Sequence, residues 1–432
     1  MSVRQKFTHG IIRLIKLLSF LALGTLLAVL LSASTVSPGT LEAQVRNISG
    51  HNEFDYASWT TDALLGKLSD WALSLQRFIS PEDQSQIVLD YLQGVQKVSA
   101  LNNELLAIYA DPAIENPDAS TAPIRESLQI EIDARDALTP LVESILQNQL
   151  MVIIQDSKIE IANQVFPPSL YHFSETPLSL VISPRATISQ VLDVSLLPDL
   201  NTTERDTIEQ QIYNDLDYSA LIVPVGGIGL YPTMVMQTSN IVWLTEVISH
   251  EWVHNFLTLR PLGINYFTNE ELRTINETTA SLAGKELGRL ILEKYYPQFV
   301  PQEPKNQPPD PDDSAVDPLT EPEAFDFRAE MRETRVETDQ LLSEGKIEQA
   351  EDYMESRRQY FWENGYAIRK LNQAYFAFYG AYNDEPGGGA SGEDPVGPAV
   401  VALRSQYTHL SDFLNDISWV TSFEKLQDLL AR

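Results

Sequence analysis

Two of the six histidines lie four residues apart and enclose a glutamate, in the run Ser249-His250-Glu251-Trp252-Val253-His254. On a helix, residues i and i+4 share one face, so His250 and His254 can reach a single ion. Imidazole is a common zinc ligand, but two imidazoles do not complete a four-coordinate site. Glu251 lies beside the pair and can act on a water molecule without binding the ion. The spacing therefore predicts a Zn²⁺ site with His250 and His254 as ligands and Glu251 as general base.

The residues around this motif predict that it lies on a buried helix. The pattern favours a helix over residues 240–259, ended by Pro261 and Gly263, with apolar residues on nearly all of its sides. Buried imidazole and carboxylate groups need a partner, and a metal ion is the simplest partner for this set. The alternative is that both histidines lie on the exposed face of an amphipathic helix and bind nothing.

A third ligand must come from another part of the chain. A metzincin would have a third histidine at position 260, but that residue is Arg260. A carboxylate from the next helix, expected over residues 269–295, is the natural candidate. Acidic residues at a helix start are expected because of the helix dipole, and those among other charged residues are expected to be solvated. Glu270 and Glu271 lie at the helix start, and Glu286 and Glu293 lie among charged residues, so the sequence accounts for these four without a metal ion.

Glu277, also on this helix, has different neighbours. It shares a helix face with the small residues Ala280, Ser281, Gly284 and Gly288. Small side chains let two helices approach closely, so a short carboxylate on that face can reach an ion held by a neighbouring helix. The pattern therefore predicts Glu277 as the third zinc ligand.

The two motifs together resemble those of a known class of metallopeptidase. His-Glu-x-x-His at 250–254, followed by Asn276-Glu277-Thr278-Thr279-Ala280, resembles the signature of the gluzincin zinc metallopeptidases. More particularly, the chain is similar to the predicted membrane-anchored bacterial aminopeptidases. The resemblance implies an α+β, mainly helical fold with a zincin-like catalytic core of a small sheet plus zinc-binding helices. Ser281 stands where thermolysin-like relatives carry an aspartate, and Gly226–Val235 contains no amine-binding glutamate. Endopeptidase and aminopeptidase cleavage both stay open.

We expect this site to hydrolyse peptide or protein substrates outside the cytoplasm with zinc-activated water. A donor to the developing oxyanion is also needed. Tyr375, Tyr379 and Tyr382 are candidates, although tyrosines in such a helix more often belong to a core. Two alternatives stay open: a non-catalytic, zinc-stabilised extracellular helical scaffold that binds a partner protein, and a hydrolase of other substrates. Glu251 favours an enzyme, because a structural zinc site needs no base.

Charge and composition argue against several other functions. The sequence has 60 acidic and 30 basic residues, and its net charge of −30 argues against binding nucleic acid or anionic lipid headgroups. It has no cysteine, so disulfides, thiolate zinc sites and cysteine nucleophiles are excluded. We interpret the acidity itself as a contribution to solubility.

The N-terminus predicts a membrane segment. A basic tail, residues 1–16, precedes an uncharged apolar stretch over residues 17–36. The positive-inside rule places the tail in the cytoplasm and the rest of the chain outside it, which makes residues 17–36 a single-pass transmembrane anchor. The alternative is a cleaved signal segment with Ser32-Ala33-Ser34 at its exit, which would give a secreted protein.

Composition and periodicity divide the rest of the chain into four regions. These are a helical region (55–165), a zincin-like catalytic core (166–298), a Pro/Asp-rich loop or linker (299–326) and a C-terminal helical region (327–432). In the core we expect strands at Leu178–Ile182, Ser219–Val225 and Leu230–Met236, and a helix at Thr203–Leu216. We interpret Gly226-Gly227-Ile228-Gly229 as a tight bend or a close backbone approach, because the other residues of a phosphate-binding loop are missing.

Overall fold

The structure of the chain is a computed structural model that describes residues 37–301, 325–381 and 388–432, apart from residues 38, 74, 111–113, 115 and 161–163. Of the described residues, 66% are helical and 8% lie in strands. The predicted α+β class with mainly helical content is therefore confirmed. The expected anchor over residues 17–36 lies outside the described residues, and so does most of the expected loop over residues 299–326.

The chain divides into two compact units, residues 1–53 and 54–432. In the first unit, α2 (Leu41–Ser49) begins after Thr40, whose hydroxyl accepts a hydrogen bond from the Ala43 N–H. A single turn of 3-10 helix, Gly50–Asn52, follows it. The elements described below belong to the second unit, which contains all the residues of the predicted site.

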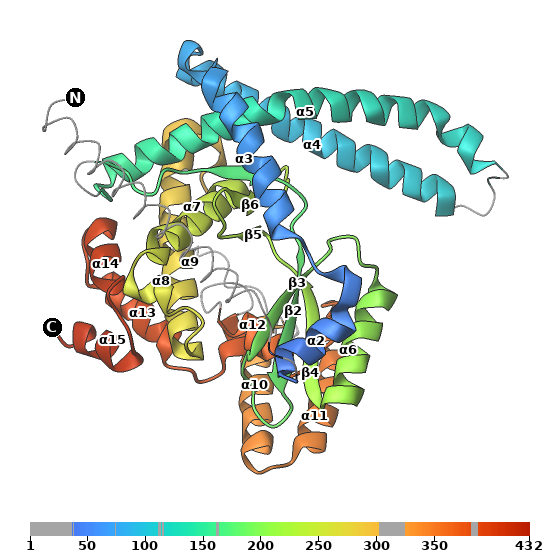
Figure 1. Cartoon of the computed structure of the whole chain (residues 1–432), viewed down its shortest axis with the longest axis vertical. Coiled ribbons are helices and arrows are strands. Elements are labelled where there is room, and N and C mark those ends of the chain that lie inside the picture. The colour runs from blue at the N-terminus through green and yellow to red at the C-terminus, as the bar shows by residue number, and fades with distance from the viewer. Residues whose placement is uncertain are drawn as a thin grey trace, which may run out of the picture. The chain divides into compact units, whose positions relative to one another are not determined.

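Three helices open the second unit: α3 (Tyr56–Leu73), α4 (Pro81–Ala110) and α5 (Pro117–Asp156). Helices α4 and α5 lie side by side (Figure 1). The Pro/Asp-rich segment of residues 111–123 predicts a break between two helical blocks. However, α5 begins inside that segment, at Pro117. The reason is local: Asn116 caps the helix, and proline is favoured at its first position.

Within the described ranges, α5 is long and apolar enough to cross a membrane. However, 44% of its most apolar window is buried inside the protein. Val142, Leu146 and Leu150 follow one another at helical spacing and are fully buried. Packing against the protein therefore accounts for the apolar face of this helix.

A first hydrophobic core surrounds α7 (Ile241–Thr258) and α9 (Glu270–Tyr295), the helices of the two predicted zinc motifs. Helices α4 and α5 contribute to this core. Helix α8 (Pro261–Ile264) contributes Leu262. Further helical members come from the C-terminal region: α13 (Val396–Ser405), α14 (Leu410–Ile417) and α15 (Phe423–Leu430).

A small sheet borders α7 in the order β1-β6-β5. Strand β1 (Tyr171–Phe173) pairs parallel with β6 (Thr233–Val235), and β6 pairs antiparallel with β5 (Gly227–Ile228). Strand β5 is therefore an edge strand of this sheet. It contains part of the glycine-rich run for which the sequence predicts a close backbone approach.

A second hydrophobic core forms on another sheet, of order β3-β2-β4. Its strands are antiparallel: β2 (Leu178–Pro184), β3 (Leu192–Leu196) and β4 (Tyr218–Pro224). Helix α6 (Thr202–Leu216) packs on β4. The helices that share this core come from the C-terminal region: α10 (Phe327–Ser343), α11 (Ile347–Glu363) and α12 (Gln373–Tyr379).

The predicted elements can be compared with these bounds. Helices α7 and α9 are confirmed, and asparagines cap both, Asn240 and Asn269. Strands β2 and β4 and helix α6 are confirmed as well. The third predicted strand is shorter than expected. Strands β1, β3 and β5 were not predicted. Strands β1 and β5 carry too few residues for an alternating pattern, whereas β3 (Leu192–Leu196) does alternate apolar and polar residues and was missed. The predicted domain boundaries stay a prediction; residues 166–298 contribute to both cores.

Candidate metal centre

Helices α7 and α9 contact each other through glycine. A Cβ atom added to Gly284 would lie 2.9 Å from the backbone N and Cα of His250, and one added to Gly288 would lie 2.9 Å from the backbone N of Glu246. A larger residue at either position would have to push the helices apart. The close approach predicted from the small residues is therefore confirmed. It brings Glu277 of α9 next to the histidines of α7.

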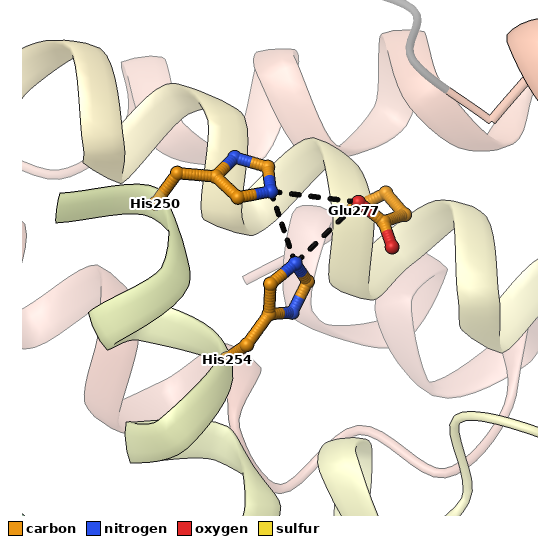
Figure 2. A group of neighbouring side chains, drawn as sticks. All are labelled: His250, His254 and Glu277. Atoms are coloured by element: carbon orange, nitrogen blue, oxygen red, sulfur yellow. Dashed lines mark hydrogen bonds and ion pairs between the residues drawn. The ribbon is translucent and has the colours of Figure 1, made fainter. Parts of the chain in front are cut away.

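His250 and His254 project from α7 toward Glu277 of α9 (Figure 2). The two Nε2 atoms are 3.0 Å apart. Oε2 of Glu277 lies 3.6 Å from Nε2 of His250 and 3.5 Å from Nε2 of His254. Two nitrogen or oxygen ligands at ordinary zinc distances around a tetrahedral ion lie about 3.3 Å apart. The triangle of donor atoms therefore has the size that a tetrahedral zinc ion requires.

One atom of this triangle lacks a hydrogen-bond partner. The Glu277 side chain is 5% exposed, and its Oε2 makes no hydrogen bond, whereas Oε1 accepts one from the hydroxyl of Tyr266. A buried carboxylate oxygen without a partner is costly. A cation between Glu277 and the two imidazoles would satisfy Oε2 and both Nε2 atoms together. The donor set therefore fits a metal ion.

The other ring nitrogens of the two histidines face polar atoms of α9. Nδ1 of His254 lies 2.8 Å from Oδ1 of Asn276, and Nδ1 of His250 lies 3.5 Å from Oγ of Ser281. An amide oxygen only accepts hydrogen bonds, so Nδ1 of His254 carries the proton, and in the neutral ring Nε2 has its lone pair free for an ion. Ser281 faces His250 at a longer distance than Asn276 faces His254.

The charges in the site change the protonation of its groups. Burial acts to lower the pKa of His254, but the neighbouring carboxylates of Glu277 and Glu251 outweigh it and raise that pKa to about 9. Burial acts to raise the pKa of Glu277, but the two imidazoles hold it well below its usual range. The stable state thus pairs an ionised Glu277 with a protonated imidazole. A cation that binds here must displace that proton.

Glu251 lies beside the triangle and against the edge strand β5. It is 6% exposed, and a Cβ atom at Gly227 would lie 2.6 Å from its Oε1. The predicted close backbone approach of the glycine-rich run is therefore confirmed, and the group it approaches is this carboxylate. Burial raises the pKa of Glu251, and the Glu277 carboxylate adds to the rise while the imidazoles oppose it.

The site opens onto a cavity of about 550 Å³. One wall consists of residues from α7, α9 and β5, and it includes the three candidate ligands and Glu251. The other wall comes from the β3-β2-β4 sheet, the loop that joins β2 to β3, and α12, with Ser179, Gln190, Asp193 and Phe378 among its residues. The cavity therefore lies between the two hydrophobic cores, and its volume is in the range of small-molecule and peptide sites.

The other glutamates of α9 lie outside the triangle. Glu270, Glu271 and Glu293 are exposed. Glu286, which the sequence analysis expects to be solvated, instead forms a two-pronged ion pair with Arg404 of α13 at 2.9 Å. The Glu286 side chain is 38% exposed, so it is still in contact with solvent. The sequence did not predict its ion pair, because the local charge pattern does not reveal that α13 packs against α9.

The predicted oxyanion donors do not line the cavity where they can be described. Tyr375 belongs to the second core and Tyr379 packs against it, with the two rings tilted and their centroids 4.5 Å apart. Tyr382 lies outside the described residues. Tyr266 lines the cavity instead. It follows the short helix α8 (Pro261–Ile264), and no periodicity or motif in the sequence distinguishes it.

Gly284→Ala is expected to lower the free energy of unfolding by about 1–3 kcal/mol, because its methyl group would overlap the backbone of His250. It should also weaken zinc binding, because the same contact sets the distance between α7 and Glu277. Gly94→Ala in α4 is the matched control, since its Cβ would meet only Arg135, at 3.9 Å. Denaturant unfolding of both variants checks this, and equal stability would contradict the close contact.

Asn276→Ala is expected to weaken zinc affinity about 10–100-fold, because His254 would lose the acceptor that orients its ring. Ser281→Ala should have a smaller effect, since Ser281 lies 3.5 Å from His250. Competition with a chelator of known affinity measures both dissociation constants. Wild-type affinity in Asn276→Ala would show that Asn276 does not position His254.

The chain was also compared with known proteins. No protein-family model matches the sequence, and no similar curated protein or solved structure was found. The inferences about this site therefore depend on the residues and geometry described above.

Proposed function

We propose that this chain is a zinc-dependent metallopeptidase. His250, His254 and Glu277 hold the zinc ion, and Glu251 is the general base. The observation that carries the proposal is the buried Oε2 of Glu277, which has no hydrogen-bond partner and lies within 3.6 Å of both imidazole Nε2 atoms. The resemblance of the two motifs to the gluzincin signature supports the same assignment.

A zinc ion in this place supplies a Lewis acid that lowers the pKa of water and polarises a carbonyl group. Glu251 takes the proton of the attacking water and delivers it to the leaving amine. Its raised pKa suits that role, because a base works best when its pKa is near the working pH. Tyr266 holds Oε1 of Glu277 and so keeps Oε2 turned toward the imidazoles.

The edge strand β5 supports a peptide over other hydrolase substrates. Gly227 and Ile228 of β5 line the cavity, and β5 is paired on one side only in its sheet. An extended peptide can add to such a sheet edge through backbone hydrogen bonds. A peptide bound there passes Glu251, whose carboxylate lies against Gly227.

A peptide library tests this function. The zinc-loaded full chain is incubated with the library, and cleavage is detected by mass spectrometry. We expect cleavage that a chelator abolishes and added zinc restores. A protein that binds one zinc ion but cleaves no peptide would contradict the peptidase and favour the zinc-stabilised scaffold.

We further propose that residues 17–36 anchor the protein in a membrane, with the catalytic region outside the cytoplasm. The proposal rests on the basic residues before this apolar stretch. The protein should stay in the membrane fraction after an alkaline wash, and a reporter fused to the C-terminus should be exported. A soluble product that begins near Thr35 would show a cleaved signal instead.

A further inference from the structure

The cavity wall that faces the metal site from the second core carries one carboxylate, Asp193 of β3. Asp193 is accessible from the cavity. Both of its hydrogen bonds to other described residues end on Oδ2, from the Ser179 hydroxyl at 2.6 Å and the Gln190 side-chain amide at 3.3 Å. Oδ1 is therefore left to accept a hydrogen bond from a molecule in the cavity.

The nearest cation does not neutralise Asp193 directly. Arg273 of α9 is 7% exposed and also lines the cavity. Its two terminal nitrogens are bound to the side-chain oxygen of Gln190 and to the backbone oxygen of Ala377. Gln190 thus stands between the two charges, with its amide group donating to Asp193 and accepting from Arg273. Burial raises the pKa of Asp193, while the hydrogen bond from Ser179 and the charge of Arg273 act to lower it.

Of the two charged groups in this part of the cavity, Asp193 is the one available to a ligand. The guanidinium of Arg273 is buried and held by protein oxygens, whereas the carboxylate of Asp193 is accessible. The net charge of the chain, −30, also favours a cationic ligand, because it attracts cationic molecules and repels anionic ones.

We propose that Asp193 is a specificity residue that binds the positively charged side chain of a lysine or arginine in a peptide substrate. This inference rests on the proposed peptidase function and names its substrate class. Asp193 belongs to β3, whereas the candidate ligands belong to α7 and α9. The long, flexible stem of a lysine or arginine can bring its cation to such a carboxylate while the peptide backbone lies at the metal site.

Binding is tested in the full chain carrying Glu251→Gln, in which turnover is expected to be slow enough for binding to be measured. The probes are acetyl-Ala-Ala-Lys-Ala-Ala-amide and the same peptide with norleucine in place of lysine. The lysine peptide should bind about 10–100-fold more tightly, and Asp193→Asn should abolish the difference. The Asn side chain can still accept from Ser179, so the fold should persist, as a thermal unfolding scan checks. Equal affinity for the two probes, or a preference that survives Asp193→Asn, would overturn the proposal.

Turnover by the chain with Glu251 intact separates this proposal from the proposed function. Cleavage of both peptides at equal kcat/KM would leave the peptidase standing and overturn the role of Asp193. Tight, Asp193-dependent binding of the lysine peptide without any cleavage would support the cation site and contradict the peptidase. Asp199→Asn, an exposed aspartate of the loop after β3 that does not line the cavity, is the matched control and should change neither measurement.

Two further variants of the test identify which charge is recognised. A norleucine peptide with a free N-terminus should bind with the same affinity as its acetylated form. If the free form binds more tightly and Asp193→Asn removes that gain, Asp193 binds the N-terminal ammonium group and the proposal is wrong. Asp193→Lys should reverse the preference, so that a glutamate peptide binds more tightly than the lysine peptide. Wild-type preference in Asp193→Lys would equally overturn the proposal.

Discussion

Glu251→Gln is expected to keep its zinc and to lose peptidase turnover, with kcat lower by about 10²–10⁴-fold. The amide has nearly the shape of the carboxylate but cannot accept the proton of the attacking water. Glu251 is not part of the donor triangle, so the metal content should stay at about one ion per chain. Metal analysis and single-turnover kinetics on the same preparation measure both quantities.

The control for this variant is Glu246→Gln. Glu246 lies on the same helix, and its side chain is not among the residues that line the cavity. Because the amide keeps the size and shape of this half-buried carboxylate, the variant should leave kcat within about twofold of the wild type. Wild-type turnover in Glu251→Gln would show that another residue is the base, or that the measured cleavage comes from a contaminating peptidase.

Replacement of the ligands is expected to have the largest effect on metal content. The double variant His250→Ala, His254→Ala should hold no zinc, because only one protein ligand would remain. Glu277→Ala should weaken zinc binding by more than about 100-fold, since the loss of a partner of a ligand alone costs 10–100-fold. Glu277→Gln should retain more affinity, because its amide oxygen can still bind the ion.

Glu271→Ala is the matched control for Glu277. It removes a carboxylate from the first turn of the same helix, where the side chain is exposed. Its zinc content should equal that of the wild type. If Glu277→Ala held zinc as tightly as Glu271→Ala, the third ligand would have to be a different group, and the lack of a hydrogen bond at Oε2 of Glu277 would need another explanation.

The candidate ligands could be named from the sequence because their geometry is mostly local. The spacing of His250 and His254 fixes their common face once a helix forms, whatever surrounds it. The side chains that begin the two helices, Asn240 and Asn269, act within one turn. The prediction of Glu277 also depended on a contact between two helices. The sequence indicates that contact, because the small residues near Glu277 recur at helical spacing and form a strip along one face.

The sequence revealed only some of the residues that contact the candidate ligands. Asn276 and Ser281 are in the second motif, but the histidine that each of them faces depends on how α9 is rotated against α7. Tyr266 lies in a connecting segment without periodicity. Its bond to Glu277 exists because the chain turns back after α8. Such contacts join residues whose local sequence has no feature in common.

The sequence by itself determined which helices form and which of their faces are apolar. It also determined which two histidines and which glutamate lie close enough to bind one ion together. The tertiary structure alone decided what surrounds these residues: the edge strand against Glu251, and the cavity wall with Gln190 and Asp193. The physical reason is the range of the interactions. Helix periodicity and capping act within a few residues. The cavity wall, by contrast, forms where a second hydrophobic core, built from strands and distant C-terminal helices, meets the first.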